Sequence, residues 1–185
     1  MSIIIRDTTL ELLEQNAEWE QTIDYCYTKW KNDVTSIDSA IRLFSQGWYL
    51  LNYWEHLPDR EAGHLVSWFH ARPELNQAHG QTILFDLQKL ENTLYLQNSK
   101  YDCITGYLMY VQPEWFLGNI YDDYSACKSE GLRRIKEIQN HNMECSLMAN
   151  IVLRHYRASS EQISPLFPGE SLVDEYFKSI FTDWH

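Results

Sequence analysis

Glu61 and His64 are the first pair in the sequence whose spacing could hold a metal. A Glu and a His three residues apart on a helix point the same way, and di-iron helical bundles combine two such pairs with two further glutamates. The sequence has this order once, and His141 and Glu144 show only the reverse order. Because one pair supplies too few ligands, we expect no metal and no cofactor.

Other patterns that carry catalytic chemistry are absent from the sequence. His64 and His70 are six residues apart, so on one helix they would point about 120° away from each other and could not share a metal. There is no G-x-S-x-G nucleophile turn, no phosphate-binding G-x-x-x-x-G-K-[ST] and no G-x-G-x-x-G. We therefore predict that the protein is not an enzyme, and we keep a helical-bundle enzyme with a carboxylate and histidine site as an alternative.

The cysteines and the apolar runs bear on the compartment. Four cysteines are widely spaced without a C-x-x-C pair, which is typical of neither a zinc site nor a redox motif: Cys26, Cys103, Cys127 and Cys145. The apolar run at residues 3–5 is shorter than the roughly 7–15 residues of a secretory signal. No apolar stretch approaches the roughly 20 residues needed to span a bilayer. We expect buried, reduced thiols in a cytoplasmic protein.

The net charge of the chain indicates which classes of partner it can bind. Fifteen basic and 26 acidic residues give a net charge of −11, which repels nucleic acid and anionic membranes and attracts cationic proteins. The chain has one basic cluster, which lies among Glu130 and Glu137: Lys128, Arg133, Arg134 and Lys136. Since Arg133 and Arg134 are three and four positions from these glutamates, ion pairs within a helix explain the cluster better than nucleic-acid binding does.

Aromatic residues in polar surroundings are the remaining candidates for function. Tyr and Trp give a large contact area with few rotatable bonds, and neighbouring carboxylates can steer a basic partner. On this basis we predict a partner-binding set: Tyr49, Tyr53, Glu114, Trp115, Tyr121, Asp122, Asp123 and Tyr124. The alternative for Trp115 and Tyr121 is that they hold a loop against the core.

The elements that must position these residues are helical. Apolar residues recur at spacings of three and four along most of the chain, which predicts an all-α domain over residues 1–185, a multi-helix bundle of antiparallel helices. The predicted helices cover 9–30, 37–57, 59–71, 82–98, 100–111, 124–138, 143–155 and 172–181. The segment 100–111 also has the composition of a strand, but it lacks a pairing partner, so helix is favoured. Loops are expected at 112–123 and 159–170.

Two helices carry more detailed expectations. Thr8 and Glu11 match a capping box that would start the first helix. The segment 37–57 is apolar over more than half of its circumference, which predicts a central core helix, with Gly47 permitting a close helix crossing. Its remaining side is expected to be polar and carries Arg42, Gln46, Tyr49, Tyr53 and His56.

The segments "IRDTTLELLEQNAEWEQ" and "AIRLFSQGWYLLNYWEHL", with the length, acidity and helical pattern of the chain, resemble the immunity proteins that bacteria encode beside polymorphic toxins, including those of contact-dependent growth inhibition. The resemblance implies a cytoplasmic protein that binds one cognate toxin domain, often a basic nuclease, and occludes its active or substrate-binding surface. It assigns no functional residues. An enzyme and a homo-oligomeric scaffold, such as a homodimer, remain the alternatives.

Overall fold

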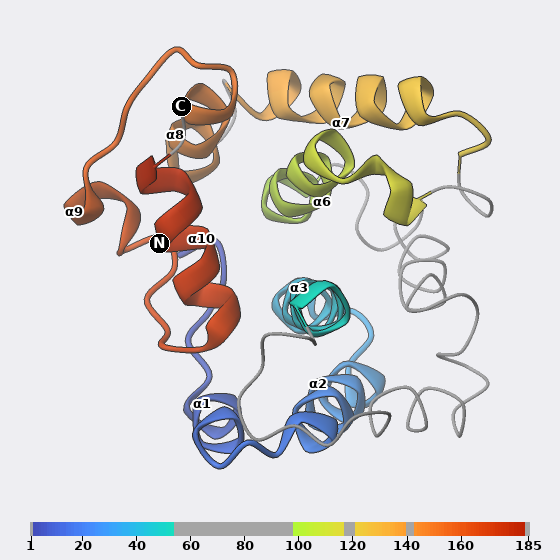
Figure 1. Cartoon of the computed structure of the whole chain (residues 1–185), viewed down its shortest axis with the longest axis vertical. Coiled ribbons are helices and arrows are strands. Elements are labelled where there is room, and N and C mark those ends of the chain that lie inside the picture. Colours follow the sequence, from blue (N-terminus) through green and yellow to red (C-terminus); the bar gives the residue numbers. More distant parts are fainter. Residues whose placement is uncertain (1, 54–97, 117–120, 140–142, 184–185) are drawn as a thin grey trace.

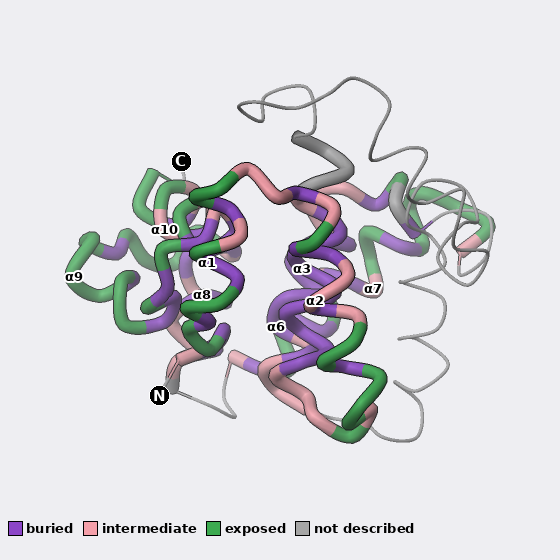
Figure 2. The backbone as a smooth tube through the Cα atoms, turned by 90° about the horizontal axis from the view of Figure 1, so that it is seen from below, coloured by how far each residue is buried: buried purple, intermediate pink, exposed green. Residues whose placement is uncertain are grey.

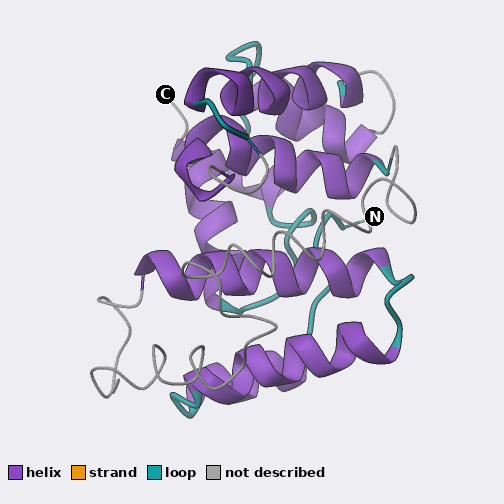
Figure 3. Cartoon of the chain, turned by 90° about the vertical axis from the view of Figure 1, so that its right-hand side faces the viewer, coloured by secondary structure: helices purple, strands orange, loops and turns teal. Residues whose placement is uncertain are grey.

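The computed structural model describes residues 2–53, 98–116, 121–139 and 143–183. Within these residues the chain forms helices and loops without a strand (Figure 3). The helices are α1 Thr8–Gln15, α2 Trp19–Asn32, α3 Ile37–Tyr53, α6 Ser99–Val111, the 3-10 helix η3 Pro113–Phe116, α7 Tyr124–Ile138, α8 Met143–Val152, α9 Ser160–Ile163 and α10 Leu172–Asp183. The predicted all-α, multi-helix fold is confirmed, and the antiparallel order stays a prediction.

Some predicted segments lie outside the described residues. These are the helix over 59–71, the helix over 82–98 except for its last residue, and the end of the 37–57 helix beyond Tyr53. Asn98 is the N-cap of α6, where its side chain accepts hydrogen bonds from the amides of Lys100 and Tyr101 at 3.1 and 3.2 Å. The choice of helix over strand for 100–111 is therefore confirmed.

Helix α3 lies in the middle of the molecule. It packs against α2, α6 and α10 (Figure 1), and Figure 2 shows that α3 and α6 are the most continuously buried helices. Ala40, Phe44 and Trp48 are at most 2% exposed. The apolar sector that the sequence shows along this helix is thus covered by several neighbours, which confirms the prediction of a central core helix.

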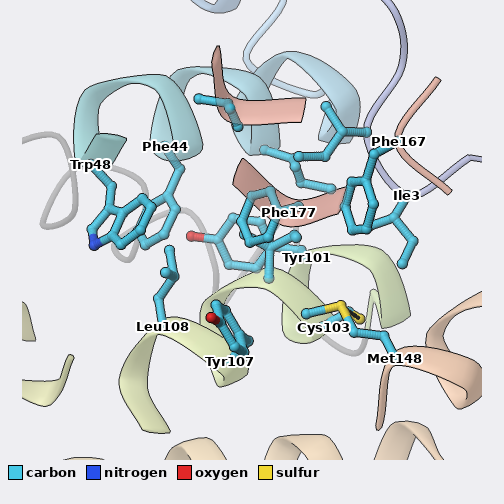
Figure 4. Packing of buried hydrophobic residues seen from close by; sticks show 14 of the residues in the cluster. Ile3, Phe44, Trp48, Tyr101, Cys103, Tyr107, Leu108, Met148, Phe167 and Phe177 are labelled. Atoms are coloured by element: carbon cyan, nitrogen blue, oxygen red, sulfur yellow. Dashed lines mark hydrogen bonds between the residues drawn. The ribbon is translucent and has the colours of Figure 1, made fainter. Parts of the chain in front are cut away.

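Aromatic rings from α6, α10 and the loop that precedes α10 pack together in the core (Figure 4). The ring of Phe177 stacks on Phe167 at a centroid distance of 5.1 Å, and Phe181 lies 5.0 Å from Tyr107. Burying one such side chain contributes about 1.5–3 kcal/mol. This cluster anchors the C-terminal helix to the centre of the fold.

Helices α6 and α7 cross at two glycines. A Cβ atom added to Gly131 would lie 2.7 Å from the carbonyl oxygen of Gly106 and 2.7 Å from the amide nitrogen of Tyr110. Only a residue without a side chain allows the two backbones to come this close. The close crossing predicted at Gly47 stays a prediction.

The start of α1 differs from the prediction. Its N-cap is Asp7, whose Oδ1 accepts a hydrogen bond from the amide of Leu10 at 3.2 Å, so the capping box predicted at Thr8 is wrong. Asp7 also accepts hydrogen bonds from Tyr25 at 3.1 Å and from Lys29 at 2.7 Å. A carboxylate that two side chains of α2 hold in place is fixed more firmly than an exposed threonine hydroxyl.

The predicted single helix over 9–30 is also wrong, because it is two helices. Ala17 has a left-handed φ of 57°, and the amides of Ala17 and Glu18 donate to the carbonyls of Glu14 and Leu13 at 3.0 and 2.9 Å. This pattern is a Schellman motif, which ends a helix and commonly uses glycine at the left-handed position. Alanine in its place leaves no signal in the sequence.

The end of α8 repeats this motif. Arg154 has a φ of 62°, its amide donates to Ile151, and the amide of His155 donates to Asn150 at 2.8 Å. Helix α8 therefore ends at Val152, and the prediction that it continues to residue 155 is wrong. The predicted loop over 159–170 holds the short helix α9, and the predicted loop over 112–123 begins with the 3-10 helix η3.

Candidate functional site

Four predicted partner-binding residues lie in η3 or at the start of α7: Glu114, Asp122, Asp123 and Tyr124, which we call the acidic patch. The amide of Tyr121, which precedes α7, donates a hydrogen bond to the carbonyl of Phe116, the last residue of η3, at 3.1 Å. This bond holds the start of α7 close to η3.

The acidic patch faces solvent. Tyr124 is 49% exposed, and the three carboxylates are exposed as well. None of these carboxylates forms an ion pair with any residue that the structure describes. The patch therefore presents negative charge beside an exposed aromatic ring, which is the combination that the sequence predicts for partner binding.

Asp123 has a structural role within the patch. Its Oδ2 accepts a hydrogen bond from the amide of Ala126 at 2.8 Å, which makes it the N-cap of α7. A carboxylate at this position also stabilises the positive end of the helix dipole. The cap fixes the backbone of the patch and leaves Oδ1 without a hydrogen bond from the described residues.

The two arginines further along α7 are neutralised by glutamates of the same helix. Arg133 contacts Glu130 at 2.6 Å and Glu137 at 2.5 Å, and Arg134 contacts Glu130 at 2.9 Å. The hydrogen bond from Arg133 is the main reason that the pKa of Glu130 is lowered. The prediction of ion pairs within this helix is confirmed.

The other predicted partner-binding residues have different surroundings. Tyr121 is half-buried against the core, as its alternative interpretation requires. Tyr49 is also half-buried, and its ring lies 5.9 Å from Tyr176 of α10. Trp115 and Tyr53 lie in described helices, but their side chains are outside the description. The structure therefore does not gather the full predicted set onto one exposed surface.

The polar side of α3 forms a buried network, which the sequence pattern does not predict. Arg42 is 5% exposed and donates hydrogen bonds to Asp174 at 2.9 Å and to Ser171 at 3.0 Å, both at the start of α10. Gln46 is fully buried and donates to Glu14 of α1 at 2.7 Å. The side predicted to be polar therefore carries Arg42 and Gln46 as expected, but it is buried, because α1 and α10 cover these residues and supply carboxylates.

Two carboxylates of α1 hold the chain that enters α10. Glu14 accepts a hydrogen bond from the amide of Leu172, and Glu11 accepts one from the amide of Glu170, both at 2.7 Å. Burial raises the pKa of Glu14 to about 6, although both its hydrogen bonds act in the opposite direction. Two spacings in the sequence could have indicated this network. Glu11 and Glu14 are three residues apart on α1, and Arg42 and Gln46 are four residues apart on α3, so each pair lies on one face of its helix.

A cavity of about 250 Å³ lies where the N-terminal segment meets α2 and α3. Its charged lining residues already have partners. Arg6 pairs with Glu11 at 3.0 Å. Lys29 pairs with Asp7 at 2.7 Å. Burial is the largest single effect on the pKa of Asp7 and raises it, but the hydrogen bonds from Lys29, Leu10 and Tyr25 and the charge of Lys29 together lower it. Because Arg42 is held by Asp174, the cavity offers no free charge of its own for a ligand.

No group of three or more His, Cys, Asp or Glu side chains in the described part of the chain is arranged to hold a metal. Glu61, His64 and His141 lie outside that part. All four cysteines are free and buried, as predicted, and burial raises the pKa of Cys26 to about 12.

In the described residues, no helix has the length and apolar character that crossing a membrane requires. Comparison of the chain with models of known protein families, with curated proteins and with solved structures finds no match.

Proposed function

We propose that this protein is a cytoplasmic immunity protein that binds a basic toxin domain, most simply a nuclease, through the acidic patch. The observation that carries the proposal is the presence of three exposed carboxylates, without a cation partner among the described residues, beside the exposed ring of Tyr124. Cationic proteins are the partners that such a surface attracts.

The local structure supports the proposal because it holds the patch in place. The cap by Asp123 and the hydrogen bond from Tyr121 to Phe116 fix the backbone on both sides of Asp122. A surface ordered before binding loses less conformational entropy in the complex. The exposed ring of Tyr124 adds contact area next to Asp123 in the sequence, with few rotatable bonds.

Electrostatics supply the mechanism. A nuclease carries a positive surface that attracts phosphates, and an acidic protein competes for the same surface. The charge of −11 accelerates association, and local carboxylates determine which face docks. Occlusion of the substrate surface needs no catalytic group in the inhibitor.

The two alternatives have less support. The cavity beside α2 and α3 holds charges that already neutralise one another, which does not favour an enzyme. A second copy of the chain would bring an identical negative patch, so repulsion disfavours a homodimer through this surface.

The test uses the product of the reading frame adjacent to the gene as the binding partner. Association rates are measured over a series of salt concentrations for the wild type and for E114Q/D122N, which removes two patch charges and leaves the Asp123 cap. The matched control is E161Q/D183N, which removes two exposed carboxylates elsewhere. We expect E114Q/D122N to slow association by about tenfold and to flatten its salt dependence. Equal slowing by both variants, or no binding, contradicts the proposal.

A further inference from the structure

The loop between α8 and α9 carries exposed positive charge. Arg154, His155, Tyr156 and Arg157, which we call the basic segment, follow the end of α8, and all four residues are exposed. No described residue forms an ion pair with Arg154, His155 or Arg157. Even Glu161, the carboxylate nearest in the sequence, pairs with neither arginine.

This lack of partners distinguishes the basic segment from the other cations of the described chain. With the exception of Lys136, the remaining described lysines and arginines form an ion pair with a carboxylate or lie over an aromatic ring: Arg6, Lys29, Lys31, Arg42, Lys100, Lys128, Arg133, Arg134 and Lys178. The basic segment therefore presents two guanidinium groups to solvent on a chain whose net charge is −11.

Hydrogen bonds hold the basic segment in place. At its start, the Schellman motif fixes the backbone of Arg154, and the amide of His155 donates to the carbonyl of Asn150 at 2.8 Å. Further along, the side chain of Gln162 on α9 donates to the hydroxyl of Tyr156 at 2.6 Å. A surface that is ordered before binding loses less conformational entropy in a complex.

The basic segment and the acidic patch lie at opposite ends of the molecule. In Figure 1, α9 and the loop that leads to it lie on the left, and the start of α7 lies on the right. Figure 2, which is turned about the horizontal axis, also shows α9 and α7 on opposite sides. One copy of the chain therefore cannot join its own two surfaces, but two copies can.

The two surfaces are complementary in charge and in side-chain type. Guanidinium groups pair with carboxylates through two parallel hydrogen bonds, and they also lie over tyrosine rings. The acidic patch offers both, since its three carboxylates are exposed without ion pairs to described residues and the residue Tyr124 is 49% exposed. We propose that the basic segment of one copy of this chain binds the acidic patch of a second copy.

Contact between unlike surfaces avoids the repulsion that two acidic patches would meet. The net charge of −11 opposes association at long range, but the Debye length at physiological salt is about 8 Å, so the charges in direct contact dominate. An interface of a few residues on each side is weak and transient. Because the contact covers the acidic patch, it competes with the toxin of the proposed function, but it forms whether or not that function is correct.

The test measures self-association of the full-length chain by sedimentation equilibrium over a range of concentrations, without any other protein. R154Q/R157Q removes two charges of the basic segment, and E114Q/D122N removes two charges of the acidic patch. We expect the average mass of the wild type to rise above the monomer mass of 22.0 kDa as concentration increases. Each variant alone should associate about tenfold more weakly. K136Q, which removes an exposed cation outside both surfaces, is the matched control and should associate as the wild type does.

A mixture of the two double variants gives the most specific measurement. E114Q/D122N keeps its basic segment and R154Q/R157Q keeps its acidic patch, so an equimolar mixture should associate about tenfold more strongly than either variant alone. Circular dichroism establishes that all variants remain helical. The proposal is overturned if the wild type stays monomeric, if K136Q loses association to the same extent as R154Q/R157Q, or if the mixture associates no more strongly than its components.

Discussion

Arg42 on α3 and Asp174 on α10 form an ion pair of 2.9 Å across 132 residues of sequence, with 5% and 0% of these residues exposed. The same guanidinium donates to Ser171, the residue that accepts from the amide of Asp174 at the start of α10. The pair therefore joins the central helix to the C-terminal helix and fixes where the latter begins.

Replacement of Arg42 by methionine should lower the free energy of unfolding by about 3–5 kcal/mol, because the carboxylate of Asp174 is left buried without its counter-charge. R42M/D174N should recover part of this loss by removing that charge. Urea denaturation measures both effects. The control is E137Q, which breaks an exposed pair with Arg133 and should cost less than about 0.5 kcal/mol. A loss in R42M as small as that in E137Q would contradict the prediction.

Glu14 should make stability depend on pH. Its pKa rises from 4.5 to about 6 in the folded state, so the folded protein binds this proton more tightly. The resulting stability is fully present below the unfolded pKa and is lost as pH rises through 6. E14Q cannot ionise, so the wild type should lose about 1 kcal/mol relative to E14Q between about pH 5 and about pH 7.5. Urea unfolding of both proteins at the two pH values checks this, and a constant difference would refute it.

Apolar periodicity predicted the interiors of the helices well and their ends poorly. It identified α3, α7 and α10 because each has an apolar face that the core buries. It missed the ends of α1 and α8, since Ala17 and Arg154 occupy the left-handed position where glycine would have marked a boundary. The apolar spacing continues across the break at Ala17, so periodicity alone predicts one helix there.

The sequence predicted the candidate site only where its residues are close together along the chain. Asp122 and Asp123 directly precede a helix that Tyr124 begins, so the exposure of these three residues follows from a short segment. The buried network was not predictable in this way. Arg42 is polar on any helical wheel, and only the arrival of Asp174 from the far end of the chain makes its burial favourable.

Replacement of Ala17 by glycine should stabilise the protein by about 0.5–1 kcal/mol. An L-residue at a φ of 57° carries steric strain of roughly 1–2 kcal/mol, and glycine removes it at some cost in unfolded-state entropy. A126G is the matched control, because Ala126 lies in regular helix, where glycine costs up to about 1 kcal/mol. Thermal unfolding should show opposite shifts for the two variants. A shift of the same sign in both would show that the Schellman turn is not strained.

Two variants of Asp123 should distinguish its role as the N-cap of α7 from its role in partner binding. D123N keeps an N-cap acceptor for Ala126 and loses the charge, whereas D123A loses both. We expect D123N to stay within a few tenths of a kcal/mol of wild-type stability and D123A to lose about 0.5–2 kcal/mol. Both should slow association with the adjacent gene product, because both remove the same negative charge. If D123N associated at the wild-type rate, Asp123 would serve the helix alone, and the patch would depend on Glu114 and Asp122.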